Sequence, residues 1–351
     1  IRDCMPKAKQ IIHVRFCICN KFTAQHVFDT VIFTKFALAE MKQPYHNPAD
    51  IPTQQPLVIT QGTFDGVHLG HQKVLKQVVA LAKSKNTQSL LITYHPHPRL
   101  VIDPNNQELR MLSSIEEKAA AVYALGVDYV LVLPFTQEFA QLSPRDFVET
   151  ILVKQLHVDT IVIGYDHRFG KNRAGDFHSL VALSNEYNFQ VQEIPASEID
   201  AIAISSTRIR KALSNKQLSE ANTLLGKPYI LTGIVVEGQK LGRTIGFPTA
   251  NLRIEDPFKL IPPTGVYAGY CELENDRYKM VCNIGTRPTV EGNSLSIEAH
   301  IFDFNKNIYN QPISLFLVQY LRNEQKFDSL ESLKTQILID AQQAQSLVTL
   351  D

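Results

Sequence analysis

The sequence predicts an α/β domain with a parallel sheet, followed by an all-β antiparallel six-stranded barrel with a C-terminal helix. Three observations lead to this prediction. Short β-rich runs alternate with amphipathic helical stretches in the first part of the chain, closely spaced strand-like runs fill the second part, and a helical stretch closes the sequence. Alternating strands and helices are typical of parallel sheets, whereas many short strands in succession are typical of barrels and sandwiches.

Five runs rich in large apolar and β-branched residues predict the strands of the α/β domain. They are 57–61, 88–94, 128–133, 158–163 and 189–194. Between them, apolar residues repeat at helical spacing in 69–83. Ser114 and Glu117 match a capping box, and Ser143 with Pro144 predicts another helix start. The sheet is therefore expected to be covered by helices on both faces.

Three unusual polar segments follow the carboxyl ends of predicted strands. They are 62–71 (GTFDGVHLGH), 94–98 (YHPHP) and 164–170 (GYDHRFG). In a doubly wound parallel sheet these strand ends share one edge, where ligands bind. The order of the segments alone therefore predicts one shared site.

The character of the sequence changes after a helical stretch at about 206–224. From 227 to 321, Gly, Pro and Asn turns separate six short strand candidates, and we expect no helix between them. One candidate alternates with period two. Leu295, Ile297, Ala299 and Ile301 face one way, whereas Ser296, Glu298 and His300 face the other.

The chain divides into a leader (1–56), an α/β domain (57–225) and a barrel domain (226–351). The barrel domain ends with a predicted helix at about 329–346. The leader begins with Ile1 rather than Met and holds three of the five cysteines within its first 19 positions. Its run 31–39 ends like a signal-peptide cleavage site, but Asp29 and Lys35 interrupt the apolar character. We expect translation to start at Met41, so that the preceding residues are absent from the native protein.

Composition limits the function classes. Lys and Arg number 35, as do Asp and Glu, so the formal net charge is zero. That balance argues against a nucleic-acid or membrane-surface binder. An odd number of cysteines without a CxxC pair indicates reduced thiols and a cytoplasmic protein. The sequence leaves the oligomeric state open.

His68 and His71 lie where the first strand gives way to a helix. Gly62 and Gly66 allow the backbone to turn tightly and approach a ligand closely. The helix N-terminus favours phosphate, and imidazoles can donate hydrogen bonds to its oxygens. Taken alone, this HxGH pair is also compatible with a metal site or with two structural histidines.

The segment 205–210 (SSTRIR) opens another predicted helix. Its hydroxyls, helix N–H groups and guanidinium groups suit phosphate. Taken alone, such a segment is more often a capped helix with a solvated basic face. Together, and after the appropriate strands, the two motifs favour a phosphate site.

At these motifs the chain resembles the nucleotidyltransferase superfamily, and within it the FAD synthetase domain of bacterial bifunctional riboflavin kinase/FAD synthetases. The segments that carry the resemblance are 62–72, 92–102, 164–176 and 204–213. Thr63 stands where many members have Asn, and His167 where many have Phe, but no motif histidine or arginine is lost. The resemblance implies a Rossmann-like fold that transfers AMP from ATP to FMN and releases pyrophosphate, with Mg²⁺.

The resemblance also implies roles for individual residues. His68, His71 and Arg208 are the expected catalytic residues. The expected ATP- and phosphate-binding residues are Gly62, Phe64, Asp65, Ser206 and Thr207. The expected flavin-binding residues are His95, Pro96, His97, Pro98, Asp166 and Phe169.

The barrel opens with a second phosphate-loop candidate, 238–251 (GQKLGRTIGFPTAN). Its glycines and basic residues suit phosphate, and Thr249 and Asn251 offer hard oxygen ligands to Mg²⁺. PTAN alone is usually a turn. Here it resembles riboflavin kinase, as do 265–269, 283–289, 297–304 and 322–337. The implied phosphate-binding residues are Gly238, Lys240, Gly242 and Arg243.

Glu298 is the candidate base of the barrel site. A primary alcohol is almost wholly protonated at neutral pH, and a nearby carboxylate can take its proton during attack on a phosphoryl group. A glutamate on the polar face of a strand is usually only a solvated residue. The resemblance to riboflavin kinase favours the catalytic role.

The leading hypothesis is a bifunctional enzyme with riboflavin, FMN, FAD and ATP as its partners: riboflavin and ATP give FMN, and FMN and a second ATP give FAD. One alternative keeps the kinase but makes the α/β domain a degenerate flavin-binding module. The other makes that domain a nucleotidyltransferase for a different phosphorylated metabolite. The intact His68, His71 and Arg208 disfavour the first alternative, and Glu298 with the complete GFPTAN motif disfavours the second.

Overall fold

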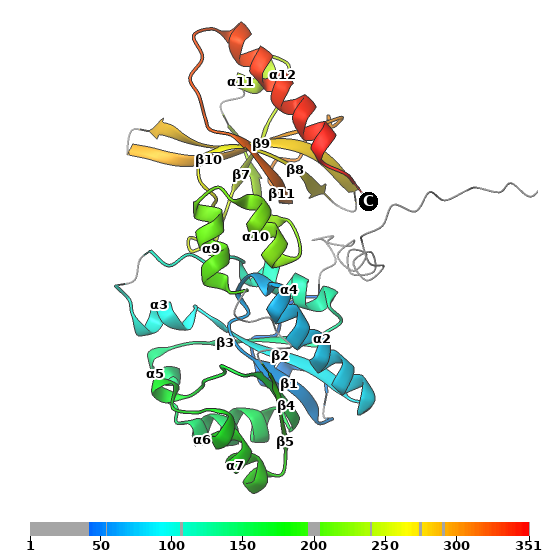
Figure 1. The fold of residues 1–351 in the computed structure, drawn as a ribbon, viewed down its shortest axis with the longest axis vertical. Helices are drawn as coiled ribbons and strands as arrows, with labels where there is room; N and C mark the ends of the chain where they lie inside the picture. Colours follow the sequence, from blue (N-terminus) through cyan, green and yellow to red (C-terminus); the bar gives the residue numbers. More distant parts are fainter. Residues whose placement is uncertain are drawn as a thin grey trace, which may run out of the picture.

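The computed structural model describes residues 42–53, 55–105, 108–195, 204–238, 241–273, 276–289 and 292–350. An α/β module and a β-barrel module are stacked along the long axis, with two helices between them (Figure 1). Segment 1–41, and with it the expected start at Met41, lies outside the described residues.

The α/β module is built on a five-stranded parallel sheet of order β3-β2-β1-β4-β5. Its strands are β1 (Leu57–Gln61), β2 (Gln88–His95), β3 (Tyr129–Pro134), β4 (Val158–Gly164) and β5 (Gln190–Ile194). Each predicted strand is confirmed. The strand order reverses direction at β1, so the crevice above its carboxyl end is the expected place for a ligand.

Helices cover both faces of the sheet, as predicted, and two separate apolar clusters fill the two interfaces. Ser114 and Glu117 form the expected capping box, and the Ser143 side chain caps its helix. The elements are η3 (Pro48–Asp50), η4 (Asp65–Val67), α2 (Leu69–Ser84), α3 (Pro98–Ile102), α4 (Ile115–Ala124), α5 (Gln137–Ala140), α6 (Pro144–Phe147), η5 (Val148–Gln155), η6 (Lys171–Arg173) and α7 (Phe177–Tyr187).

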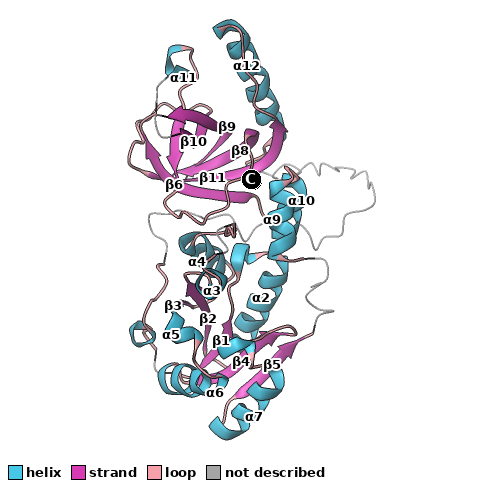
Figure 2. Ribbon diagram, turned by 90° about the vertical axis from the view of Figure 1, so that its left-hand side faces the viewer, coloured by secondary structure: helices cyan, strands magenta, loops and turns pink. Residues whose placement is uncertain are grey.

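The helical stretch predicted at 206–224 is two helices, α9 (Ser206–Ser214) and α10 (Leu218–Leu225). They are separated at Lys216, whose φ of 60° is left-handed. Both helices lie between the sheet and the barrel (Figure 2). Their apolar faces belong to the same core cluster as the inside of the barrel. The domain boundary near residue 225 stays a prediction, because these helices contact both modules.

The second module is a closed antiparallel barrel of order β10-β7-β6-β11-β8-β9, which confirms the prediction. Helix α12 (Leu330–Leu347) packs against β8 and β9. The strands are β6 (Tyr229–Val236), β7 (Ala250–Arg253), β8 (Gly265–Leu273), β9 (Asp276–Thr289), β10 (Gly292–Ile301) and β11 (Pro312–Arg322). Among the described residues, no helix is long and apolar enough to cross a membrane.

Two details of the barrel differ from the expectation. A short helix, α11 (Leu241–Thr244), lies between β6 and β7, so the prediction of no helix there was wrong. A single turn is too short to show apolar periodicity. In β10, Ile297, Ala299 and Ile301 are buried as expected. Leu295 continues their row but is 46% exposed and lines a surface cavity.

Candidate active sites

The histidine motif opens α2, directly after the turn that follows β1. Phe64 and Val67 adopt left-handed backbone conformations, with φ of 45° and 46°, and this tight turn brings the next residues back over the sheet edge. The Nδ1 atom of His68 accepts a hydrogen bond from the backbone N–H of His71 at 3.4 Å, capping α2. The two imidazole rings stack with their centroids 3.6 Å apart. Both side chains therefore lie at a helix N-terminus, where anions are stabilised.

Burial keeps both imidazoles uncharged at neutral pH. It lowers the pKa of His68 to about 4, although the Asp65 charge opposes the shift. It lowers the pKa of His71 well below its ordinary value, and the neighbouring His68 adds to the effect. The Nδ1 atom of His71 is buried and has no hydrogen-bond partner among the described residues. A neutral imidazole keeps one N–H donor, so each ring can still donate to a phosphate oxygen.

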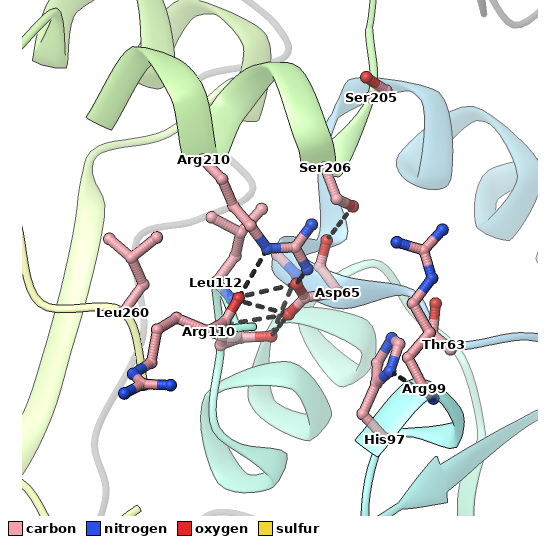
Figure 3. Close-up of polar contacts among 12 residues, drawn as sticks. Thr63, Asp65, His97, Arg99, Arg110, Leu112, Ser205, Ser206, Arg210 and Leu260 are labelled. Atoms are coloured by element: carbon pink, nitrogen blue, oxygen red, sulfur yellow. Dashed lines mark hydrogen bonds and ion pairs between the residues drawn. The ribbon is translucent and has the colours of Figure 1, made fainter. Parts of the chain in front are cut away.

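Asp65 joins the histidine loop to helix α9. Its carboxylate accepts hydrogen bonds from the backbone N–H groups of Leu112, at 2.9 Å, and Ser113, at 3.2 Å. The guanidinium of Arg210 lies 2.5 Å away (Figure 3). The Ser206 hydroxyl donates to the Asp65 carbonyl at 3.1 Å. The carboxylate is thus occupied by protein groups and repels anions, so this geometry does not support direct phosphate contact. It supports a positioning role for Asp65.

Sequence reasoning did not select Arg210 as a site residue. Its guanidinium also donates to the Arg110 carbonyl at 2.6 Å (Figure 3). The sequence did hold a signal for Arg210, because Ser206 and Arg210 are four positions apart and therefore share one face of the helix. Arg208 instead forms an ion pair with Glu220 of α10 at 2.7 Å, and its side chain is 49% exposed. Thr207, at the start of the same helix, is exposed.

The three polar segments meet at one sheet edge, as predicted. Gln61, at the end of β1, accepts a hydrogen bond from the Tyr94 hydroxyl at 2.9 Å. Its amide nitrogen lies 3.0 Å from Nε2 of His167. One side chain therefore connects the carboxyl end of β2 to the loop after β4.

The predicted flavin-binding residues separate into two groups. His95, Pro96 and His97 line a small pocket together with Asp65, and Pro98 begins α3 beside them. Asp166 is exposed on the loop after β4, and nothing in its surroundings assigns it a ligand. Phe169 is 7% exposed and packs in the core, 5.9 Å from the Phe147 ring. Its position supports a packing role rather than contact with a flavin.

The barrel module contributes to this pocket, which sequence reasoning missed. Asp256 and Phe258, from the connection after β7, line it. This connection is held by backbone hydrogen bonds to Met111: the Met111 N–H donates to the Phe258 carbonyl at 2.7 Å, and the Leu260 N–H donates to the Met111 carbonyl at 2.8 Å. No local pattern in the sequence marks such a contact between distant segments.

The second constellation lies where β7 pairs with β10. Asn251 stands directly opposite Glu298 in the register. The Thr249 hydroxyl donates to Oε2 of Glu298 at 3.2 Å. His300, two positions along β10, contacts the carbonyl of Pro248 through Nδ1 at 2.8 Å and thereby holds the loop in place. The structure thus brings together the three polar residues chosen from the sequence for the barrel site.

Glycines allow close backbone approach around this constellation. A Cβ atom on Gly238 would lie 2.3 Å from the Asn251 amide nitrogen, and one on Gly242 would lie 2.2 Å from the Phe247 carbonyl oxygen. The Phe247 carbonyl is backbone, so the loop needs glycine at position 242, whereas a side chain at position 238 would displace the Asn251 amide. Arg243 is exposed on α11. Lys240 lies outside the described residues.

A cavity of about 370 Å³ adjoins Asn251. Its apolar walls include Val236, Ile254, Ile261 and Leu295. Among the described residues, no group of three or more His, Cys, Asp or Glu side chains is placed to hold a metal ion. The hydroxyl, amide and carboxylate oxygens of the barrel site are nevertheless the hard donors that Mg²⁺ accepts together with phosphate oxygens.

Comparison with known proteins agrees with this division into two sites. A model of the FAD synthetase family matches residues 50–208, and a model of the riboflavin kinase family matches residues 225–348. A bifunctional riboflavin kinase/FMN adenylyltransferase of Listeria monocytogenes is 39% identical over 306 residues, which are 86% of this chain and 96% of that protein. The chain belongs to the bifunctional riboflavin kinase/FMN adenylyltransferase family.

Other members of this family show similar likeness. The Bacillus subtilis protein is 38% identical, with 83% of this chain and 92% of that protein covered. The Escherichia coli K12 protein is 38% identical, with 84% of this chain and 93% of that protein covered. A solved structure from Streptococcus pneumoniae, titled a macrolide-efflux protein, has a TM-score of 0.76 and 31% identity, with 86% and 98% covered. The family and the fold predicted from the sequence are both confirmed.

Proposed function

We propose that this member of the family catalyses two successive reactions in flavin cofactor biosynthesis. The barrel module transfers the γ-phosphoryl group of ATP to riboflavin and produces FMN. The α/β module transfers AMP from a second ATP to FMN, which produces FAD and pyrophosphate. The observation that carries the proposal is the presence of two separate polar constellations: stacked His68 and His71 in one module, and Thr249, Asn251 and Glu298 in the other.

In the adenylyltransferase site, an oxygen of the FMN phosphate attacks the α-phosphorus of ATP, and the bond to pyrophosphate breaks. No covalent protein intermediate is needed, so alignment and charge stabilisation supply the catalysis. The neutral imidazoles of His68 and His71 donate hydrogen bonds to phosphate oxygens at the N-terminus of α2. Ser206, Thr207 and Arg208 complete the binding of the triphosphate. Asp65 holds Arg210 and the start of α9 in place.

In the kinase site, Glu298 takes the proton of the ribityl 5′-hydroxyl as that oxygen attacks the γ-phosphorus. The hydrogen bond from Thr249 fixes one carboxylate oxygen. The cavity beside Asn251, whose walls are partly apolar, receives the flavin ring. Thr249 and Asn251 would hold Mg²⁺, which neutralises phosphate charge when bound.

The domain limits and the cellular location belong to the same proposal. We assign the adenylyltransferase to residues 57–225 and the kinase to residues 226–351. We also propose that the protein works in the cytoplasm. The buried, unpaired thiols of Cys271 and Cys282 support a reducing compartment.

One experiment separates the three hypotheses. Purified protein is incubated with riboflavin and MgATP, and the flavins are resolved by chromatography. Successive appearance of FMN and FAD is expected. FMN without FAD would indicate a kinase with a degenerate α/β module. The absence of both products would indicate a nucleotidyltransferase for a different metabolite.

A further inference from the structure

Lys118 places a buried amine in the adenylyltransferase pocket. It lies on α4, is 5% exposed, and lines the pocket together with Tyr94, His97 and Phe258. Its charge contributes to lowering the pKa of both His71 and His97. The amine is therefore close to the histidine motif and also to the loop after β2.

The described protein groups supply few hydrogen-bond acceptors to the Lys118 amine. An ammonium has three donors. In the described part of the chain, one hydrogen bond of the Lys118 amine is found, to the Thr93 hydroxyl at 3.2 Å, and no carboxylate lies within ion-pair distance. The nearby Asp65 carboxylate is bound by Arg210. Lys259, which is equally buried, has Glu117 as its counter-ion. A buried charge without a partner is costly, so Lys118 needs an anion that the described protein groups do not supply.

We propose that Lys118 binds the phosphate group of FMN, the acceptor of the adenylyl transfer. The proposal rests on the adenylyltransferase function proposed above. The pocket is small, which suits a phosphate group rather than a whole nucleotide. The aromatic rings of Tyr94, His97 and Phe258 border it, and they suit a flavin ring at the pocket mouth better than a polyphosphate. Lys118 then holds the attacking phosphate beside His71.

The pocket holds the Lys118 amine together with two carboxylates, Asp65 and Asp256, and Arg210 offsets the charge of Asp65. Burial lowers the pKa of Lys118 to about 8, although the charges of Asp65 and Asp256 oppose the shift. At neutral pH most of the amine is still protonated. A bound phosphate dianion would replace lost solvation and raise the pKa again.

The test is a steady-state analysis of Lys118→Met in the full-length protein. The KM for FMN in the adenylyl transfer is expected to rise by about tenfold or more, because a hydrogen bond to a charged group is lost. The KM for ATP and the riboflavin kinase rate should stay within about twofold of wild type. Lys118→Arg, which keeps the charge, should lie closer to wild type than Lys118→Met does. Lys85→Met is the matched control, because Lys85 pairs with Asp159, which lies at the opposite edge of the sheet.

A second readout separates loss of phosphate binding from deformation of the pocket. Lumiflavin carries the flavin ring without a phosphate, and its inhibition constant against FMN should be the same in Lys118→Met and in wild type. A parallel rise for lumiflavin and FMN would overturn the proposal, as would a rise confined to the KM for ATP or an unchanged KM for FMN. If wild-type protein forms no FAD, the adenylyltransferase function itself is wrong.

Discussion

Lys259 of the barrel module and Glu117 of helix α4 form a buried ion pair between the two modules. The amine lies 2.5 Å from Oε2 of the carboxylate, and the side chains are 1% and 5% exposed. The other carboxylate oxygen accepts a hydrogen bond from the N–H of Thr232 in β6 at 2.9 Å. Lys259 also donates to the Leu112 carbonyl at 2.7 Å. The same carboxylate thus caps α4 and contacts two separate segments of the barrel module.

Glu117→Gln should destabilise the whole chain. The substitution leaves the Lys259 charge buried without a counter-ion, and removing one partner of a buried pair costs about 3–5 kcal/mol. Urea unfolding, followed by circular dichroism, measures the change in the free energy of unfolding. Glu186→Gln is the control, because the Arg145–Glu186 pair is exposed and should matter little. Adding Lys259→Met to Glu117→Gln should restore part of the loss; purely additive losses would contradict the coupling of the two residues.

Substitutions in the two sites should separate the two reactions. His71→Ala is expected to reduce FAD formation from FMN by about a hundredfold or more, because a donor to developing phosphate charge is lost. Glu298→Gln is expected to reduce FMN formation by about a hundredfold or more, because the base is lost. Each variant should keep the other reaction, measured by supplying riboflavin or FMN separately. If either substitution stopped both reactions in folded protein, the assignment of two sites would be wrong.

The sequence was sufficient for elements with a strong local pattern. Strands β1 to β4 are largely buried, so runs of β-branched and apolar residues mark them. The Ser114–Glu117 capping box is a local pair of hydrogen bonds and could likewise be found. Helix α11 and the break at Lys216 could not, because single turns and single left-handed residues leave little trace in hydrophobic periodicity.

The two sites were predictable only in part, because some of their contacts join segments that are far apart in the sequence. The strand order predicts that loops meet at one edge, and the contacts of Gln61 with Tyr94 and His167 agree. The role of Asp65 depends on its partner Arg210, which is far away in sequence. The contribution of Phe258 to the pocket depends on how two modules pack. Such contacts arise from tertiary structure and have no local signal.

Phe258→Ala should weaken FMN binding in the α/β module, although Phe258 belongs to the barrel module. Loss of one aromatic face costs about 1–2 kcal/mol, so the KM for FMN in the adenylyl transfer should rise about tenfold. The KM of the kinase for riboflavin should stay within about twofold of wild type, because the Phe258 side chain borders the adenylyltransferase pocket and not the kinase cavity. Phe177→Ala, a partly buried ring on α7, is the control. An unchanged KM for FMN would show that the barrel module does not shape the adenylyltransferase pocket.

Stability should fall as the pH falls from 6.5 toward 5, because three buried or half-buried histidines stay neutral in the native protein. Burial lowers the pKa values of His68, His97 and His167 to about 4, from an ordinary value of 6.5. Between these values the unfolded chain binds more protons than the native protein, so each histidine lowers the free energy of unfolding by up to about 1.4 kcal/mol per pH unit. Above pH 6.5 both states are neutral, and the contribution is constant.

His167→Gln isolates one of these contributions. The variant keeps a polar side chain next to Gln61 but cannot take up a proton. Its free energy of unfolding, measured with urea at several pH values, should fall less steeply than that of wild type between pH 6.5 and 5, by up to about 1.4 kcal/mol per pH unit. Above pH 7 the two proteins should show parallel dependence on pH. Equal slopes below pH 6.5 would mean that His167 takes up its proton in the folded protein as readily as in the unfolded chain.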